Sequence, residues 1–354
     1  MNPPMVNPLD PRPKVLLTHR VHAQVIQRLQ ANCEVDHNDS GRILTADEVR
    51  RRAREATAIM AFMTDRIDRG FLAECPRLRI VAGAFKGYDN IDVSACTQHG
   101  VWVTCVRELL TVPTAELAIG LLLSLTRNIV AGDRLMRNEH FAGWRPVLYG
   151  TGLTGKCLGI YGMGAVGRAI VERMAGFEMP TVYYDPRPFT TEFERALSVR
   201  RVNLNELFAE SDYLVIAAPL TAQNLHAFDD AAFARMKTGI FMVNIGRGSV
   251  VDEQAVSRAL ESGKLAGYAA DVYEMEDLSR ATRPSQVEPR PLVDAARTVL
   301  TPHLGSAVDS IREQIALEAA DEILAALRGE VPPGAVNRLV TSPPRLPFQK
   351  SPGP

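Results

Sequence analysis

The chain is poor in lysine and cysteine, and it has no long hydrophobic run. Only six of its 40 basic residues are lysines, at positions 14, 86, 156, 237, 264 and 350. The cysteines are odd in number and form neither a CxxC pair nor a ligand-like cluster: Cys33, Cys75, Cys96, Cys105 and Cys157. These features predict free thiols in a reducing compartment and no metal site.

Two further absences limit the location and the partners. The first 14 residues contain no apolar stretch of the signal-peptide kind, and the longest apolar run, 117–125, is too short to span a bilayer. We therefore expect a cytoplasmic protein with no membrane partner. The net charge of -1 provides no broad basic field, so nucleic acid is not an expected partner.

The length of 354 residues predicts two domains. Short apolar runs alternate with helical patterns from residue 14 onward, and this alternation is typical of an α/β fold with parallel sheets and helices on both faces. Proline-rich ends, 1–13 and 341–354, are expected to be flexible tails. The apolar stretch that begins at residue 111 predicts one or two long helices, either buried between domains or part of a subunit interface.

A glycine-rich turn begins a second series of strands and helices at residue 156. Gly162, Gly164 and Gly167 fit G-x-G-x-x-G between a strand and an amphipathic helix, and Asp185 follows at the end of the next strand. Such a turn lets a pyrophosphate approach the helix N-terminus, and Asp185 would bind the ribose hydroxyls. This pattern predicts an NAD site that includes Met163, Ala165 and Val166. Asp185 would repel the 2′-phosphate of NADP and so favour NAD, and Arg187, two residues later, would partly offset this preference.

Three polar residues stand at strand ends of the second series, where ligands bind in open parallel sheets. Arg247 lies in NIGRGSVVDE, Glu276 in AADVYEMED and His303 in TPHLGSA. A cation, a carboxylate and an imidazole beside one crevice suit hydride transfer from an anionic substrate. We expect Arg247 to bind the anion, His303 to exchange a proton and Glu276 to orient the imidazole.

These motifs, in this order, resemble the D-2-hydroxyacid dehydrogenase superfamily over most of residues 14–340. The resemblance implies two Rossmann-like domains, with an NAD-binding domain (111–303) inserted into a substrate domain (14–110 and 304–340). It implies catalysis by Arg247, Glu276 and His303, and it adds Pro219, Asp271 and Gly305 to the cofactor site. It also implies a homodimer built around the long helices after residue 111.

Within the superfamily, the chain most resembles the phosphite (phosphonate) dehydrogenases. The similarity lies in THRVH, AFM-x-DR at 61–66, KGYDNID at 86–92, ELLTVPTAELAIGL at 108–121 and GWRPVLYGTGL at 143–153. Typical 2-hydroxyacid enzymes have a small or apolar residue where Lys86 stands. The resemblance implies oxidation of phosphite to phosphate, with hydride transfer from phosphorus to NAD and with water as the nucleophile. It implies a substrate site in a cleft opposite Arg247 and His303 that contains Lys86, Gly87, Met63, Trp144, Tyr149, Ser306 and Arg312.

Several alternatives remain open from the residues alone. Trp144 and Tyr149 fit plain packing of an aromatic cluster as well as a pocket wall. The chain also fits an ordinary 2-hydroxyacid dehydrogenase, such as a glyoxylate or hydroxypyruvate reductase, and less well a formate dehydrogenase or a NAD-sensing corepressor. Residues 277–300 are longer and richer in proline and arginine than the family pattern, so this loop could alter substrate access.

Overall fold

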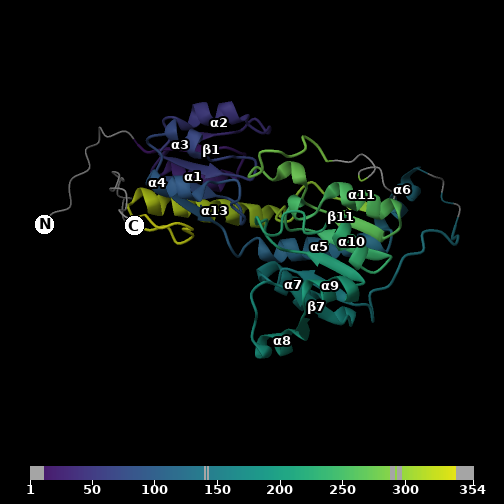
Figure 1. Ribbon diagram of the computed structural model, residues 1–354. Helices are drawn as coiled ribbons and strands as arrows, with labels where there is room; N and C mark the ends of the chain where they lie inside the picture. Colours follow the sequence, from purple (N-terminus) through teal and green to yellow (C-terminus); the bar gives the residue numbers. More distant parts are fainter. Residues whose placement is uncertain (1–11, 139–140, 142, 288–291, 293–296, 340–354) are drawn as a thin grey trace. The chain divides into compact units, whose positions relative to one another are not determined.

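In the computed structural model the chain forms two compact units (Figure 1). Unit 1 comprises Met1–Leu110 and Val308–Pro354, and unit 2 comprises Thr111–Ala307. The sequence places the second boundary between residues 303 and 304, four residues earlier. The structure describes residues 12–138, 141, 143–287, 292 and 297–339. The tails expected at 1–13 and 341–354 lie outside the described residues, except for Arg12 and Pro13.

Unit 1 contains a five-stranded parallel sheet in the order β2-β1-β3-β4-β5. The strands are β1 (Lys14–Leu17), β2 (Glu34–His37), β3 (Ala58–Ala61), β4 (Ile80–Gly83) and β5 (Trp102–Cys105). Every residue of β3, β4 and β5 is buried, because helices cover both faces of the sheet. The continuous apolar runs in the sequence are therefore central strands, as predicted.

Some helices of unit 1 begin at capping side chains, namely Thr45, Asp68 and Asp92. The helices of the unit are α1 (Ala23–Gln30), α2 (Ala46–Ala53), α3 (Arg69–Ala73), α4 (Val93–Gln98) and α13 (Asp309–Leu327). At α2 the Thr45 hydroxyl accepts from the Glu48 backbone N–H at 3.3 Å, and the Glu48 carboxylate accepts from the Thr45 N–H at 2.8 Å. This is a capping box. Helix α13 returns from the C-terminal side of the chain to lie beside α1 (Figure 1).

Unit 2 contains a seven-stranded parallel sheet in the order β12-β11-β10-β9-β6-β7-β8. The strands are β6 (Leu158–Tyr161), β7 (Thr181–Tyr184), β8 (Val199–Arg201), β9 (Tyr213–Ile216), β10 (Ile240–Asn244), β11 (Leu265–Ala270) and β12 (Thr298–Leu300). The chain reverses its direction across the sheet between β6 and β9. Ligands of open α/β sheets bind outside the carboxyl ends of strands at such a point. The α/β class with two parallel sheets, predicted from the sequence, is confirmed.

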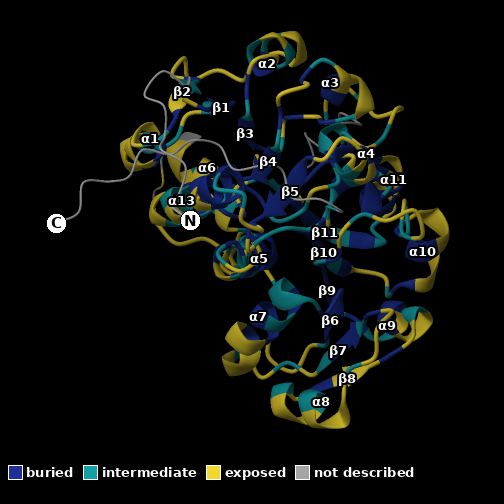
Figure 2. Ribbon diagram, turned by 90° about the vertical axis from the view of Figure 1, so that its left-hand side faces the viewer, coloured by how far each residue is buried: buried dark blue, intermediate teal, exposed yellow. Residues whose placement is uncertain are grey.

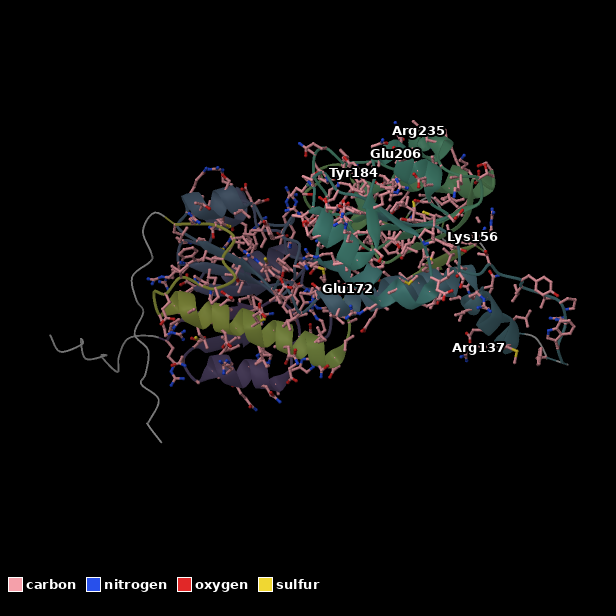
Figure 3. All side chains as sticks on the ribbon, turned by 90° about the horizontal axis from the view of Figure 1, so that it is seen from below. Arg137, Lys156, Glu172, Tyr184, Glu206 and Arg235 are labelled. Atoms are coloured by element: carbon pink, nitrogen blue, oxygen red, sulfur yellow. The ribbon has the colours of Figure 1, made fainter. Side chains whose placement is uncertain are left out.

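Helices cover both faces of this sheet, and the strands between them are buried (Figure 2). One face packs against α5 (Thr111–Thr126), α7 (Ala165–Met174) and α8 (Thr191–Leu197). The other packs against α9 (Leu204–Glu210), α10 (Asp230–Arg235) and α11 (Glu253–Glu261). Figure 3 labels exposed side chains of both layers, Glu172 on α7 and Glu206 and Arg235 on α9 and α10. The described residues of the unit also form three 3₁₀ turns: η1 (Ala175–Phe177), η2 (Gly248–Val250) and η3 (Glu274–Glu276).

The long helical stretch after residue 111 consists of two helices. Helix α5 ends at Thr126, Asn128 adopts a left-handed φ of 53°, and α6 (Ile129–Asn138) follows at a bend of 64°. In the described part of the chain no single helix is long and apolar enough to cross a membrane. The bent pair meets that criterion by length and composition only, and α5 belongs to the core of unit 2.

Candidate active site

The glycine-rich turn joins β6 to α7 at the carboxyl end of the sheet. Gly162 has a φ of 99°, which favours glycine, and a Cβ there would lie 2.9 Å from the Ala218 nitrogen. A Cβ on Gly167 would lie 2.2 Å from the Gly162 oxygen. A Cβ on Gly164, the residue that precedes α7, would meet nothing within 4 Å. The turn is therefore packed on its protein side and open at the helix N-terminus, where an anion binds best.

Asp185 follows β7 and is nearly fully buried. One carboxylate oxygen accepts from the Met163 N–H at 3.0 Å and the other from the Arg187 N–H at 2.9 Å. These bonds fix the carboxylate beside the glycine-rich turn. A carboxylate oxygen can accept more than one hydrogen bond, so both remain able to bind ribose hydroxyls. The turn and Asp185 together fit a dinucleotide such as NAD.

Asp271 follows β11 and holds the segment that carries His303. Its Oδ1 accepts from the Thr301 hydroxyl at 2.7 Å and from the Leu304 N–H at 2.6 Å, and its Oδ2 accepts from the Gly305 N–H at 2.8 Å. Burial raises the pKa of Asp271, and these hydrogen bonds oppose the rise. Asp271 was expected only in the cofactor site. Its contacts show that it also anchors the segment on either side of His303. Pro219 follows β9, and its carbonyl accepts from the Asn224 amide at 2.8 Å.

Arg247 is carried by the turn that follows β10. Asn244, the last residue of the strand, accepts from the Gly246 N–H at 3.1 Å and donates to the Arg247 carbonyl at 3.0 Å. The Arg247 guanidinium donates to the Gly246 carbonyl at 2.9 Å. The turn is therefore closed by an asparagine that the motif search did not single out. Its position at a strand end was the only available signal.

Glu276 and His303 form a pair. Glu276 ends η3, and its Oε1 accepts from the Tyr273 N–H at 2.9 Å, which fixes the carboxylate. Its Oε2 lies 2.5 Å from Nδ1 of His303. An ionised carboxylate only accepts hydrogen bonds, so Nδ1 carries a proton and Nε2 of the neutral ring is the basic nitrogen. His303 has a left-handed φ of 56°, a conformation that is uncommon for a residue other than glycine.

Unit 1 gathers further cations at the carboxyl end of its own sheet. Lys86 and Gly87 follow β4 and are partly buried, as is Met63 after β3. Arg312, in the first turn of α13, donates to the Ala84 carbonyl at 3.3 Å. Its guanidinium also lies 5.7 Å from the centre of the Phe62 ring. Arg312 is thus held beside the residues that follow β4, where Lys86 also stands, while Arg247, Glu276 and His303 belong to unit 2. Their predicted meeting in one cleft stays a prediction.

His19 belongs to this group in unit 1, although the sequence did not mark it as a site residue. It follows β1, its Nε2 lies 2.7 Å from the Thr64 hydroxyl, and its ring contacts Phe62 at a centroid distance of 4.9 Å. Burial lowers the pKa of His19, and the positive charge of Arg312 lowers it further. A neutral imidazole is therefore favoured beside the arginine. The THRVH motif contained this residue, but nothing in the motif gave it a role.

Trp144 and Tyr149 lie on the segment that follows α6. They are 83% and 77% exposed, and the backbone of this segment is held where the Asn128 amide donates to the Tyr149 carbonyl at 3.3 Å. Among the described residues these two side chains are therefore not part of the core of unit 2. Their role as pocket walls stays a prediction. Ser306, the remaining predicted pocket residue, is buried in unit 2.

Known proteins resemble the chain over almost its full length. The profile described as "D-isomer specific 2-hydroxyacid dehydrogenase, NAD binding domain" matches residues 119–305. The glyoxylate reductase of Pyrococcus horikoshii is 36% identical over 334 residues, which are 93% of this chain and 97% of that protein. The solved glyoxylate reductase of Paecilomyes thermophila has a TM-score of 0.79 and 28% identity, over 92% of this chain and 99% of the other. The D-lactate dehydrogenase of Escherichia coli has a TM-score of 0.75 and 28% identity, over 92% and 100%.

Proposed function

The chain belongs to the D-isomer specific 2-hydroxyacid dehydrogenase family, and within this family of NAD-dependent dehydrogenases we propose that it oxidises phosphite to phosphate. The observation that carries the proposal is the set of cations. Lys86 and Arg312 are gathered at one strand end of unit 1 and Arg247 follows β10 in unit 2. A phosphite dianion has three oxygens, so it calls for more positive charge than the single carboxylate of a 2-hydroxy acid.

Each cation suits a different part of phosphite. The planar guanidinium of Arg247 binds two oxygens side by side, and the ammonium of Lys86 binds a third as a compact point charge with three donors. Arg312 adds a further positive charge. A charge-assisted hydrogen bond is about twice as strong as a neutral one, so this set would distinguish phosphite from a less charged substrate.

His303 and Glu276 supply the proton chemistry of the proposal. NAD, when bound, supplies the acceptor for the hydride that leaves phosphorus. Water adds its oxygen to phosphorus as the P–H bond breaks, so phosphite, NAD and water give phosphate, NADH and one proton. Nε2 of His303 takes that proton from the attacking water, and Glu276 stabilises the imidazolium that forms. The alternative role of His303, orienting the substrate, would leave the proton to solvent.

A second candidate is reduction of glyoxylate or a related 2-oxo acid. The named relatives favour it, because several relatives of this chain are glyoxylate reductases at 34–36% identity. The same residues would serve: Arg247 would bind the carboxylate and His303 would deliver a proton to the carbonyl oxygen. Lys86 and Arg312 have no necessary role in this reaction, which is the physical ground for ranking it second.

A substrate panel separates the two candidates. Purified protein is incubated with NAD and phosphite, D-lactate, D-glycerate or formate, and with NADH and glyoxylate or hydroxypyruvate, while absorbance reports NADH. We expect phosphite to have the highest kcat/KM. Turnover of glyoxylate with none of phosphite would overturn the proposal in favour of the second candidate. Absence of turnover with every compound, together with NADH binding, would instead support a NAD-sensing corepressor.

We also propose that the protein is a homodimer that uses α6 and the segment after it. Ile129 and Met136 on α6 are each 54% exposed, and Phe141, Trp144 and Tyr149 follow with exposures of 52–83%. Exposed apolar side chains gathered in one stretch of chain are typical of an interaction surface. Figure 3 shows α6, with Arg137 labelled, extending beyond the end of α5. A cytoplasmic location stays a prediction.

A further inference from the structure

Two turns of unit 2 carry the proposed reactive residues and lie directly against each other. Arg247 immediately precedes η2, and Glu276 is the last residue of η3. A Cβ on Gly248 would lie 1.9 Å from the Tyr273 carbonyl carbon and 2.3 Å from the Glu274 nitrogen. The backbones of the two turns are therefore in contact, and only a glycine fits between them.

Buried polar groups join the same two turns, and we call Ser249, Glu274, Asp277 and Arg280 the clamp. The Ser249 N–H donates to the Asp277 carboxylate at 2.7 Å. The Arg280 guanidinium donates to the Ser249 hydroxyl at 2.8 Å and to the Glu274 carboxylate at 2.5 Å. Ser249, Glu274 and Asp277 are 0%, 7% and 2% exposed. The Ser249–Asp277 bond joins the Arg247 turn directly to the residue after η3. Arg280 joins the two turns as well, because it binds Ser249 on one and Glu274 on the other.

The 3₁₀ turn η3 thus carries two carboxylates with different partners. Glu276 faces His303, whereas Glu274 faces His226 at 2.9 Å and Arg280. Burial tends to raise the pKa of Glu274, but the hydrogen bonds from His226 and Arg280 outweigh it, so that the pKa is lowered and the carboxylate stays ionised. His226 also donates its backbone N–H to the Ser249 carbonyl at 2.8 Å, which adds a second link to the Arg247 turn.

We propose that Asp277 and Arg280 are positioning residues, which act through Ser249 and Glu274 to keep Arg247 and the Glu276–His303 pair in fixed register. The inference deepens the proposed function and rests on it, because it takes these three residues as the reactive groups. Hydride transfer demands alignment, and a displacement of about 1 Å can cost roughly a hundredfold in rate. The proposal also gives a role to the start of the long, arginine-rich segment at 277–300.

The test replaces Arg280 by methionine, which keeps much of the length and removes every clamp hydrogen bond of the side chain. The matched control is Arg258→Met, since Arg258 is an exposed arginine of α11 that donates to the Asp230 carboxylate of α10 and to neither turn among the described partners. Activity is measured with whichever panel compound the wild type uses best. We expect kcat to fall ten- to hundredfold in Arg280→Met, with the KM for NAD unchanged within twofold, partial recovery in Arg280→Lys and no change in the control.

Hydrogen–deuterium exchange provides a readout that does not depend on turnover. Peptides that cover 245–251 and 273–277 should exchange faster in Arg280→Met than in wild type or the control, whatever the substrate is. Unchanged exchange in both peptides, or an unchanged kcat, would overturn the clamp even if phosphite is the substrate. If Arg280→Met does not fold, Ser249→Ala decides: we expect a two- to fivefold lower kcat, and an unaltered kcat would overturn the proposal. A wild type without any turnover would refute the proposed function alone.

Discussion

Lys86 is one of the few lysines in this arginine-rich chain, and it stands shortly after the buried strand β4. If its ammonium binds a phosphite oxygen, Lys86→Ala should raise the KM for phosphite ten- to hundredfold, because a lost charge-assisted hydrogen bond costs roughly 1.5–3 kcal/mol. Steady-state kinetics measure the effect. Lys156→Ala, which removes an exposed lysine of unit 2, is the control and should leave KM unchanged. Equal KM values for Lys86→Ala and wild type would remove Lys86 from the site.

Glu276 is the residue on which the orientation of His303 depends. Glu276→Gln keeps the size of the side chain but removes the charge opposite Nδ1. An amide can donate as well as accept, so it no longer selects the tautomer with the proton on Nδ1 and no longer stabilises the imidazolium. We expect kcat/KM to fall about a hundredfold or more with NAD binding retained. The exposed Glu261→Gln on α11 serves as the control. A change of less than about threefold would contradict the assigned role.

Asp65 in unit 1 links stability to pH. Its carboxylate is buried, and burial raises its pKa to about 6 although the Thr18 hydroxyl at 2.5 Å and the Phe62 N–H at 2.7 Å oppose the rise. A folded-state pKa above the unfolded value means that the folded protein binds more protons, so stability falls as pH rises between the two values. Because the unfolded value is 3.8, the loss amounts to about 3 kcal/mol at most.

Asp65→Asn should remove this dependence, since asparagine can accept the same two hydrogen bonds without ionising. Urea unfolding between pH 4 and 7 measures it: the free energy of unfolding of wild type should decline relative to the variant as pH rises. Parallel curves for the two proteins would show that Asp65 has an ordinary pKa.

At the scale of elements, the glycine-rich turn depends on close contact between α7 and β6. Gly167→Ala places a Cβ 2.2 Å from the Gly162 oxygen and forces the turn to move. Overpacking of this kind costs roughly 1–3 kcal/mol, and we expect a lower melting temperature together with a KM for NAD raised tenfold or more. Gly176→Ala in η1 is the matched control, because a Cβ there meets nothing within 4 Å. A Gly167→Ala protein with wild-type NAD affinity would contradict this account of the turn.

Local signals explain which elements could be predicted from the sequence. The capping box at Thr45 and Glu48 predicts the start of α2, and the fully apolar runs predict the central strands, because both depend on neighbouring residues. The break between α5 and α6 could not be located, since it rests on a left-handed Asn128 within an apolar stretch that looks continuous. Sequence periodicity does not reveal a single backbone angle.

The site, too, has parts that the sequence predicts and parts that it does not. The glycine-rich turn, Asp185 and the strand-end positions of Arg247, Glu276 and His303 follow from motifs that a short window contains. The Glu274–His226 contact joins residues 48 positions apart, and Arg280 reaches Ser249 across 31 positions. Such contacts depend on how η2 and η3 pack, so no spacing in the sequence predicts them. The resemblance to a family suggested roles for single residues but did not reveal the hydrogen bonds that hold those residues in place.

At the scale of the whole molecule, the exposed apolar side chains of α6 and the following segment predict self-association. Light scattering coupled to size-exclusion chromatography should give about twice the chain mass of 38.8 kDa. Met136→Glu places a charge on this surface and should shift the protein toward monomer, whereas Arg137→Glu, at an exposed polar position of the same helix, should do so less. A wild-type protein with the mass of a single chain would refute the dimer.

The family, fold and cofactor are common to both candidate reactions, so the substrate is the point at which the account is most exposed. Lys86, Arg312 and Arg247 together favour an anion with three oxygens, while the named relatives favour a 2-oxo acid. The two reactions differ in the atom that loses hydride. In the oxidation of phosphite, hydride leaves phosphorus. In the oxidation of a 2-hydroxy acid, which is the reverse of glyoxylate reduction, hydride leaves carbon.

The most direct measurement therefore follows the hydrogen itself. Purified protein is incubated with NAD and phosphite that carries deuterium on phosphorus, and the products are analysed by phosphorus NMR and mass spectrometry. The account predicts one phosphate and one NADH per phosphite consumed, with the deuterium on the nicotinamide. Phosphite that remains unchanged, in a preparation that reduces glyoxylate with NADH, would contradict it.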